Sequence, residues 1–272
     1  MALPPLTYTS AHVVLNVPVD EPTPRTDEVA QQLAAALHGE FDAHLEQELP
    51  EIAPAEVPFL ILPGRSMQIA FSQIQADMEI EFRDAYAERA DLCRPHVGKK
   101  MTKLLEAWER VGARPVWQGL VVTLRASTKG QPEAESHVRH MLDTHLRSGL
   151  ASDALHDAKL QVGLRLMDRY FVTLALGHYE ARSVQRQIIP GTASGPIRPW
   201  EGELTDEGLE LTVDINNRYG ALLVKKHTRV TSEEMQAMND LGWQLVEHVA
   251  VPFANDGVLD LSAIQHEQQA AV

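Results

Sequence analysis

Several short segments of the chain alternate between large apolar side chains and small or polar ones, and this pattern constrains the fold more than any other feature. Residues 67–72 and 78–83 both have a large apolar residue at every second position. Successive side chains of a β-strand point to opposite faces, so each segment would bury one face and leave the other in water. The alternation therefore predicts an antiparallel sheet that is covered on one side.

Further segments extend the predicted sheet. Residues 160–167 alternate in the same way, and Asp168-Arg169 can turn the chain into a second strand at 170–176, which predicts a hairpin. Strands are also predicted from apolar content at residues 11–19, 59–62, 116–125 and 209–215. Pro18 cannot donate to a ladder, so the first of these strands is expected at an edge of the sheet.

Helices are predicted between these strands. One apolar stripe runs from Val97 to Val111, and Gly112 follows it as a C-terminal cap. Thr231 and Glu234 form a capping box that opens a helix near the C-terminus. Thr26 and Asp27 begin a third helix, and residues 135–146 are expected to form a fourth. Residues 243–253 fit both the helical and the strand period, so the pattern leaves their structure open.

The order of elements predicts an α+β fold of antiparallel sheets with helices packed on one face, because it lacks regular strand–helix alternation. The length of 272 residues suits one large domain or two modest ones. We expect an N-terminal α+β half at residues 1–130, a C-terminal α+β half at 131–253 and a weakly structured tail at 254–272. The two halves could be loosely similar copies of one unit.

Charge and cysteine content limit the partners and the compartment. The formal net charge of −14 repels nucleic-acid phosphate and anionic membranes, although solubility alone also explains such acidity. A single cysteine excludes an intrachain disulfide and a zinc site built from several thiolates. The N-terminus lacks the pattern of a signal peptide, and no apolar run is long enough to span a membrane. We therefore expect a cytoplasmic protein.

Three landmarks resemble a known protein family. They are Pro4-Pro5-Leu6 before the first strand, the strand from Pro115 to Arg125, and the strand LTVDIN (211–216) followed by the capped helix at Thr231. In that order they resemble a sporadically distributed bacterial family of unknown function, over most of the chain. The match departs from the family at residues 119–122, where Gly-Leu-Val-Val replaces a Gly-Leu-Arg-Tyr type of strand. The resemblance implies a mobile-element or defence context, but it supplies no catalytic residues.

The best candidate for metal chemistry lies on the predicted helix near residue 137. Glu133, His137 and His140 are spaced by four and three residues, which places them on one helical face within reach of one ion. Such a site would support a metal-assisted or phosphate-directed hydrolase. The alternative is a solvated polar face opposite an apolar stripe.

A basic group forms the second candidate site. Arg94, Lys99, Lys100 and Lys103 precede and open the helix predicted from Val97, and a helix N-terminus favours anions. These residues could dock a phosphate or an acidic partner. The alternative is a solvated helix face whose lysines pair with nearby acids such as Glu106.

Two further positions, Cys93 and the loop around Trp200, each allow a functional interpretation and a simpler structural one. Cys93 precedes Arg94 in a basic setting that could lower the pKa of a thiol, but a buried, unreactive cysteine is the simpler interpretation. The long loop at residues 186–203 carries Arg198 and Trp200, where an exposed indole could anchor a partner. Packing of Trp200 against the core is the alternative.

No catalytic motif is complete in the sequence. Gly98-Lys99 lacks the other residues of a phosphate loop, and Gly64-Arg65-Ser66 lacks the second glycine of a nucleophile elbow. We therefore expect a non-enzymatic protein that binds a protein partner or associates with itself, without a cofactor. The hydrolase that uses the His137 helix is the alternative function, and nucleic-acid binding ranks below both.

Overall fold

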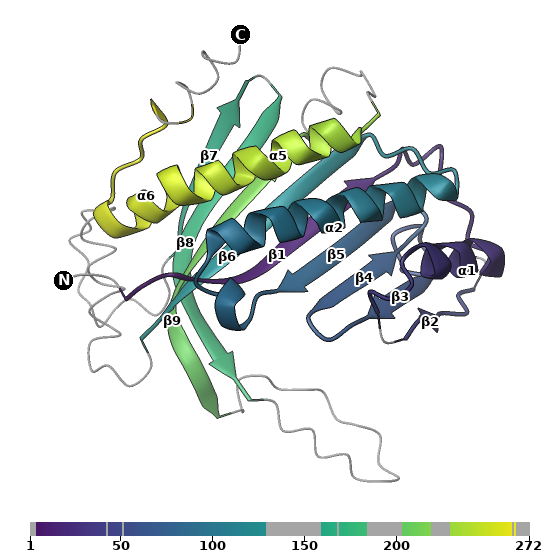
Figure 1. Cartoon of the computed structure of the whole chain (residues 1–272), viewed down its shortest axis with the longest axis horizontal. Coiled ribbons are helices and arrows are strands. Elements are labelled where there is room, and N and C mark those ends of the chain that lie inside the picture. The colour runs from purple at the N-terminus through teal and green to yellow at the C-terminus, as the bar shows by residue number, and fades with distance from the viewer. Residues whose placement is uncertain are drawn as a thin grey trace.

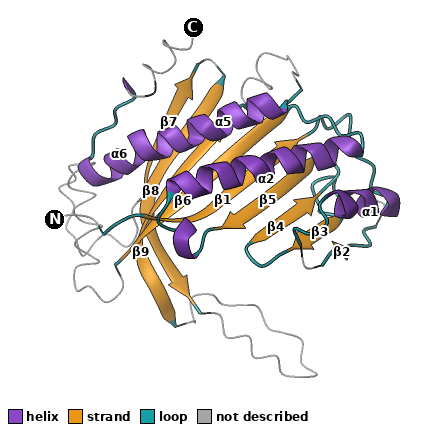
Figure 2. Ribbon diagram, in the orientation of Figure 1, coloured by secondary structure: helices purple, strands orange, loops and turns teal. Residues whose placement is uncertain are grey.

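In the computed structural model, the nine strands of the described residues form a single antiparallel sheet (Figures 1 and 2). The structure describes residues 4–41, 43–50, 52–128, 159–167, 169–183, 203–218, 229–262 and 264. The strands are β1 (Thr7–Asn16), β2 (Leu45–Glu46), β3 (Leu60–Pro63), β4 (Met67–Phe71), β5 (Gln75–Glu81), β6 (Trp117–Ser127), β7 (Lys159–Leu166), β8 (Tyr170–Arg182) and β9 (Leu204–Asn216).

The helices lie together on one face of this sheet (Figure 1). This arrangement confirms the predicted α+β class and the predicted placement of helices on one side. The helical elements are α1 (Asp27–Ala36), a 3₁₀ turn (Asp84–Tyr86), α2 (Ala90–Arg110), α5 (Ser232–Leu245), a π turn (Val246–Ala250) and α6 (Val251–Asp256).

The strand order is β2-β3-β4-β5-β1-β6-β9-β8-β7, which places β1 and β6 at the centre. β1 pairs with β5 on one side and with β6 on the other. The prediction of an edge position for this segment is therefore wrong. The reason is that β1 ends at Asn16, so Pro18 lies beyond the ladder and costs it no hydrogen bond.

The core lies between the sheet and the two long helices. In β1 the side chains of Ala11, Val13 and Leu15 point to the helices and are fully buried, as the strand period requires. Trp108 of α2 and Trp243 of α5 are the largest fully buried side chains in the described residues. Burial of apolar area on this scale is the main stabilising contribution to the fold.

Glycines let the helices approach their neighbours closely. A Cβ atom added at Gly98 of α2 would lie 2.9 Å from the Gln236 side chain of α5. One added at Gly242 of α5 would lie 3.0 Å from Leu120 and 3.2 Å from Ile215 on the sheet. These distances are shorter than normal van der Waals contacts, so a side chain at either position would force its neighbours to move; at Gly98 the neighbour is the flexible end of Gln236, whereas at Gly242 it is the packed surface of the sheet.

Residues 243–253, whose structure the sequence pattern left open, belong to the C-terminal helical segment. α5, the π turn and α6 follow one another without a break, so this segment is helical. In a regular α-helix the carbonyl of His248 would accept a hydrogen bond from residue 252, which is a proline without an N–H group. The widened turn directly before Pro252 accommodates this mismatch.

Other predicted elements can be compared directly. The three strands after residue 58 and the capping box at Thr231 are confirmed. α2 begins at Ala90, earlier than the sequence pattern indicated, and β8 and β9 are longer than predicted. The helix predicted at residues 135–146 lies outside the described residues.

Candidate binding site on the open face of the sheet

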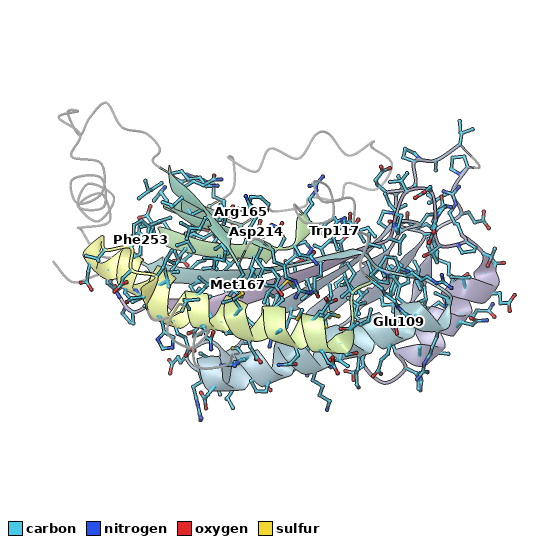
Figure 3. The ribbon with its side chains drawn as sticks, turned by 90° about the horizontal axis from the view of Figure 1, so that it is seen from above. Glu109, Trp117, Arg165, Met167, Asp214 and Phe253 are labelled. Carbon is cyan, nitrogen blue, oxygen red and sulfur yellow. The ribbon has the colours of Figure 1, made fainter. Side chains whose placement is uncertain are left out.

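The face of the sheet opposite α2 and α5, called the open face below, carries the polar side chains of the strands. Because Ala11 and Val13 of β1 point to the helices, His12 between them points to the open face. Figure 3 shows Trp117, Arg165 and Asp214 on the side of the sheet away from α5.

Strand register brings residues that are distant in sequence together at the centre of the open face. His12 of β1 lies opposite Glu79 of β5 and opposite Val121 of β6. Val121 in turn lies opposite Asp214 of β9. Directly opposed side chains on one face are near neighbours. This row of residues, flanked by Asp77 on β5, forms the candidate site.

An ion pair lies at the centre of this site. The Nε2 atom of His12 is 3.0 Å from an Asp77 carboxylate oxygen, and the Gln75 amide donates a hydrogen bond of 2.5 Å to the other oxygen. The hydrogen bond to Asp77 raises the pKa of His12 above its ordinary value, and the charges of Glu79 and Asp214 add to the increase. Burial acts in the opposite direction. The imidazole therefore holds a proton to a higher pH than a free histidine.

Negative charge remains at this centre after the pairs are counted. Asp77 pairs with His12, and within the described residues Glu79 and Asp214 take part in no ion pair. Asp214 accepts a hydrogen bond of 3.1 Å from the Asn216 amide, and Glu79 is exposed. Between the two acids lies the apolar side chain of Val121. The site therefore offers two carboxylates that have no ion-pair partner among the described residues, around a small apolar patch, which suits a cationic side chain with an aliphatic stem.

The charged side chains farther along the open face are paired or hydrogen-bonded with one another. Arg125 of β6 donates to Glu210 of β9 at 2.8 Å, and its guanidinium lies 4.5 Å from the centre of the Tyr179 ring. The Tyr179 hydroxyl donates to Asp206 at 2.7 Å. Burial raises the pKa of Tyr179, and its bond to Asp206 reinforces that direction. These contacts form an internally satisfied network next to the unpaired centre.

The basic group predicted from sequence lies elsewhere, on the helical side of the molecule. Arg94 donates to Asp240 at 2.8 Å, and Lys100 and Lys103 both pair with the same carboxylate of Glu40. These two lysines lower the pKa of Glu40 to about 2. Lys99 is exposed and takes part in no ion pair within the described residues.

The N-terminus of α2 lies away from the three lysines of this group. α2 begins at Ala90, so the three lysines lie well inside the helix and away from its unpaired N–H groups. Three of the four basic residues already have carboxylate partners, though Glu40 rather than Glu106 pairs with the lysines. Anion binding at this group stays a prediction, now without the contribution of the helix terminus.

The remaining sequence candidates fall into two groups. Cys93 is fully buried, donates to the Tyr86 carbonyl at 3.0 Å, and has its pKa raised to about 12 by burial, so the expected burial of this side chain is confirmed. Outside the described residues lie the predicted metal ligands Glu133, His137 and His140 and the predicted loop residues Arg198 and Trp200. Within the described part of the chain, no group of histidine, cysteine and acidic side chains is arranged to hold a metal ion.

Sequence reasoning missed the central site, although part of the signal was present. The strand period places His12 and Asp214 on the polar faces of their strands. The period gives no information about which strands are neighbours, and His12 and Asp77 are 65 residues apart. Only the strand order β5-β1-β6-β9 brings these side chains together.

Comparisons with known proteins leave the site to be interpreted from its own geometry. No protein-family model matches the chain, and no curated protein is significantly similar to it. Among the described residues, no helix is both long and apolar enough to cross a membrane.

Proposed function

We propose that this protein is a non-enzymatic binding protein whose open sheet face docks a protein partner through basic side chains. One observation carries the proposal: Glu79 and Asp214, which take part in no ion pair within the described part of the chain, lie on either side of His12 and Val121 on a face that no described helix covers. Lysine or arginine side chains of a partner would neutralise these acids and cover Val121. The same acids disfavour the phosphates of a nucleic acid.

The resemblance noted in the sequence suggests where such a partner is found. It supports a partner encoded beside this protein in a bacterial mobile element or defence system. The alternative function, a metal-assisted or phosphate-directed hydrolase, depends on Glu133, His137 and His140, which lie outside the described residues.

We further propose that the chain consists of two copies of one unit, with the binding site at their junction. In contrast to the halves expected at residues 1–130 and 131–253, these units would divide before β6, so that the first contains β1, β3, β4, β5 and α2 and the second contains β6, β7, β8, β9 and α5. The antiparallel ladder between β1 and β5 corresponds to the antiparallel ladder between β6 and β9. The spatial order β3-β4-β5 likewise corresponds to the order β7-β8-β9. His12 and Asp77 belong to the first unit and Asp214 to the second, so both units supply the site.

Charge reversal at the site tests the proposed function. The double variant Glu79→Lys with Asp214→Lys should weaken partner binding by at least about tenfold, because like charges would then face each other across the interface. The control variant, Glu106→Lys with Glu233→Lys, changes the net charge equally at two exposed positions of the helical face. We expect it to bind as the wild type does.

The measurement has two stages. Affinity capture from the host with the wild type and both variants identifies a protein that the control retains and the site variant loses. Titration of that purified protein then gives the affinities, and the binding should weaken as salt is added. Equal retention by both variants, or capture of nothing that depends on the open face, contradicts the proposal.

A further inference from the structure

The strand β7 ends the sheet and presents a long edge. It pairs with β8 over its whole length, from Lys159 opposite Gly177 to Leu166 opposite Tyr170. No described strand pairs with its other edge, which lies at the end of the sheet in Figure 2. Unpaired N–H and C=O groups along a strand edge are a template for pairing with another chain.

The opposite end of the sheet is built differently. There β3 is followed in the strand order by β2, whose residues Leu45 and Glu46 pair with Ile61 and Leu60. The Gln47 N–H adds a hydrogen bond of 2.9 Å to the Phe59 carbonyl. β3 is short and has this extra strand, whereas β7 has eight residues and no such strand among the described residues. Among the described residues the two ends of the sheet are therefore unequal, and β7 presents the longer edge to a second strand.

A glycine in the middle of β7 supports the approach of a second backbone. Gly163 has no left-handed backbone angle, and a Cβ atom added to it would have no described atom within 4 Å. The described part of the chain therefore gives no packing reason for glycine here, although glycine weakens a strand interior. Close approach of another chain is a reason for its presence.

The side chains of β7 suit pairing with a second copy of the same strand. Leu160, Val162, Leu164 and Leu166 share the helix side, and the first three are only partly buried. A two-fold axis perpendicular to the sheet places the helix sides of both copies on the same side of the joined sheet. These apolar residues would therefore meet only each other across the edge.

Charge selects one register among those that this axis allows. With the axis at Gly163, Leu160 opposes Leu166 and Val162 opposes Leu164 of the second copy, while Gln161 opposes Arg165. With the axis at Val162, Lys159 would oppose Arg165 of the second copy, and directly opposed like charges are destabilising. A shift to Leu164 shortens the ladder. The axis at Gly163 therefore gives the longest ladder without opposed like charges.

We propose that two copies of this protein associate through β7, antiparallel and with a two-fold axis at Gly163, to form one continuous sheet. Because the axis is perpendicular to the sheet, both open faces lie on the same side of the dimer. Two sites on one side would bind a partner with repeated basic segments more tightly than one site does. The dimer uses a different surface from the partner site, so either proposal can fail without the other.

Disulfide trapping tests the register. In Gly163→Cys the two cysteines would lie directly opposite each other, about 5 Å apart between Cβ atoms, close enough to form a disulfide with small adjustment. The open space at this position allows the new side chain in each copy. In the control Gln161→Cys the two cysteines would be about 13 Å apart, because four strand residues separate them. The native Cys93 is fully buried, so the wild type gives the background level of crosslinking.

We expect Gly163→Cys to form a covalent dimer under mild oxidation, and Gln161→Cys and the wild type to remain uncrosslinked. Sedimentation of the wild type over a wide concentration range should show a dimer, and Val162→Lys should weaken it at least about tenfold, because a charge would oppose Leu164 of the second copy. A wild type that sediments as a monomer throughout, or crosslinking of Gly163→Cys no faster than that of Gln161→Cys, overturns the proposal.

Discussion

His12 is the titratable residue whose charge controls the middle of the open face. Its side chain is 43% exposed and that of Asp77 is 31% exposed, so solvent weakens their attraction. Protonation of His12 leaves Glu79 and Asp214 as the charges available to a partner. Deprotonation adds the charge of Asp77 to theirs. The proposed site therefore becomes more negative as the pH rises.

The raised pKa of His12 makes the stability of the protein depend on pH with a definite sign. The folded state binds the proton more tightly than the unfolded chain, so the stabilisation is fully present below the ordinary pKa of 6.5 and is lost as the pH rises through the higher folded value. Replacement by glutamine, His12→Gln, removes this contribution. Exposure limits it to about 1 kcal/mol or less.

Urea unfolding of the wild type and His12→Gln between acidic and alkaline pH measures the effect. We expect the wild type to exceed the variant most at pH values below 6.5. The difference should shrink steadily at alkaline pH. A constant difference across the range would mean that the His12–Asp77 contact does not depend on the proton.

At the level of elements, close packing between α5 and the sheet depends on a residue without a side chain. Gly242 stands where a Cβ atom would already be 3.0 Å from Leu120. We expect Gly242→Leu to destabilise the protein by about 1–3 kcal/mol, because the added atoms force the helix away from the sheet. Ala237→Leu, at an exposed position of the same helix, is the control and should change stability by less than about 0.5 kcal/mol. Thermal and urea unfolding give both values, and similar losses in the two variants would refute the packing argument.

Elements with strong local signals could be predicted from the sequence, and those that depend on distant pairing could not. The alternation at Met67 and Met78 correctly indicated strands with one buried face, and Thr231 caps α5 with the full reciprocal pair of hydrogen bonds. Pro18 misled because a proline restricts its own position and carries no information about how far the strand extends. The candidate site was missed for a related reason, since the neighbours of β1 are fixed only by long-range pairing.

At the scale of the whole molecule, the central ladder between β1 and β6 joins the two proposed units. It pairs residues from Thr7 opposite Arg125 to Asn16 opposite Trp117. On the helix side it buries Val13 against Leu120 and Ala11 against Val122, and α2 packs on α5 above it. Separation of the units would expose this apolar surface together with the edges of β1 and β6. Neither unit should therefore be stable alone, even though each would have its own strands and long helix.

Cutting the chain between α2 and β6 tests this dependence. Residues 1–112 and 113–272, expressed separately, should each be insoluble or self-associated. The reason is that the edge of β1 or β6 exposed in each fragment has unpaired N–H and C=O groups that can pair with another chain. Coexpression with a tag on one fragment should recover both in a one-to-one complex with a cooperative unfolding transition. A control cut at residues 64–65 divides the β3–β4 hairpin within the first unit, so it splits one unit between fragments and should restore the fold less efficiently. A fragment that is monomeric and cooperatively folded alone would show that the β1–β6 ladder is a contact between independent domains, and it would contradict the expected dependence of each unit on the other.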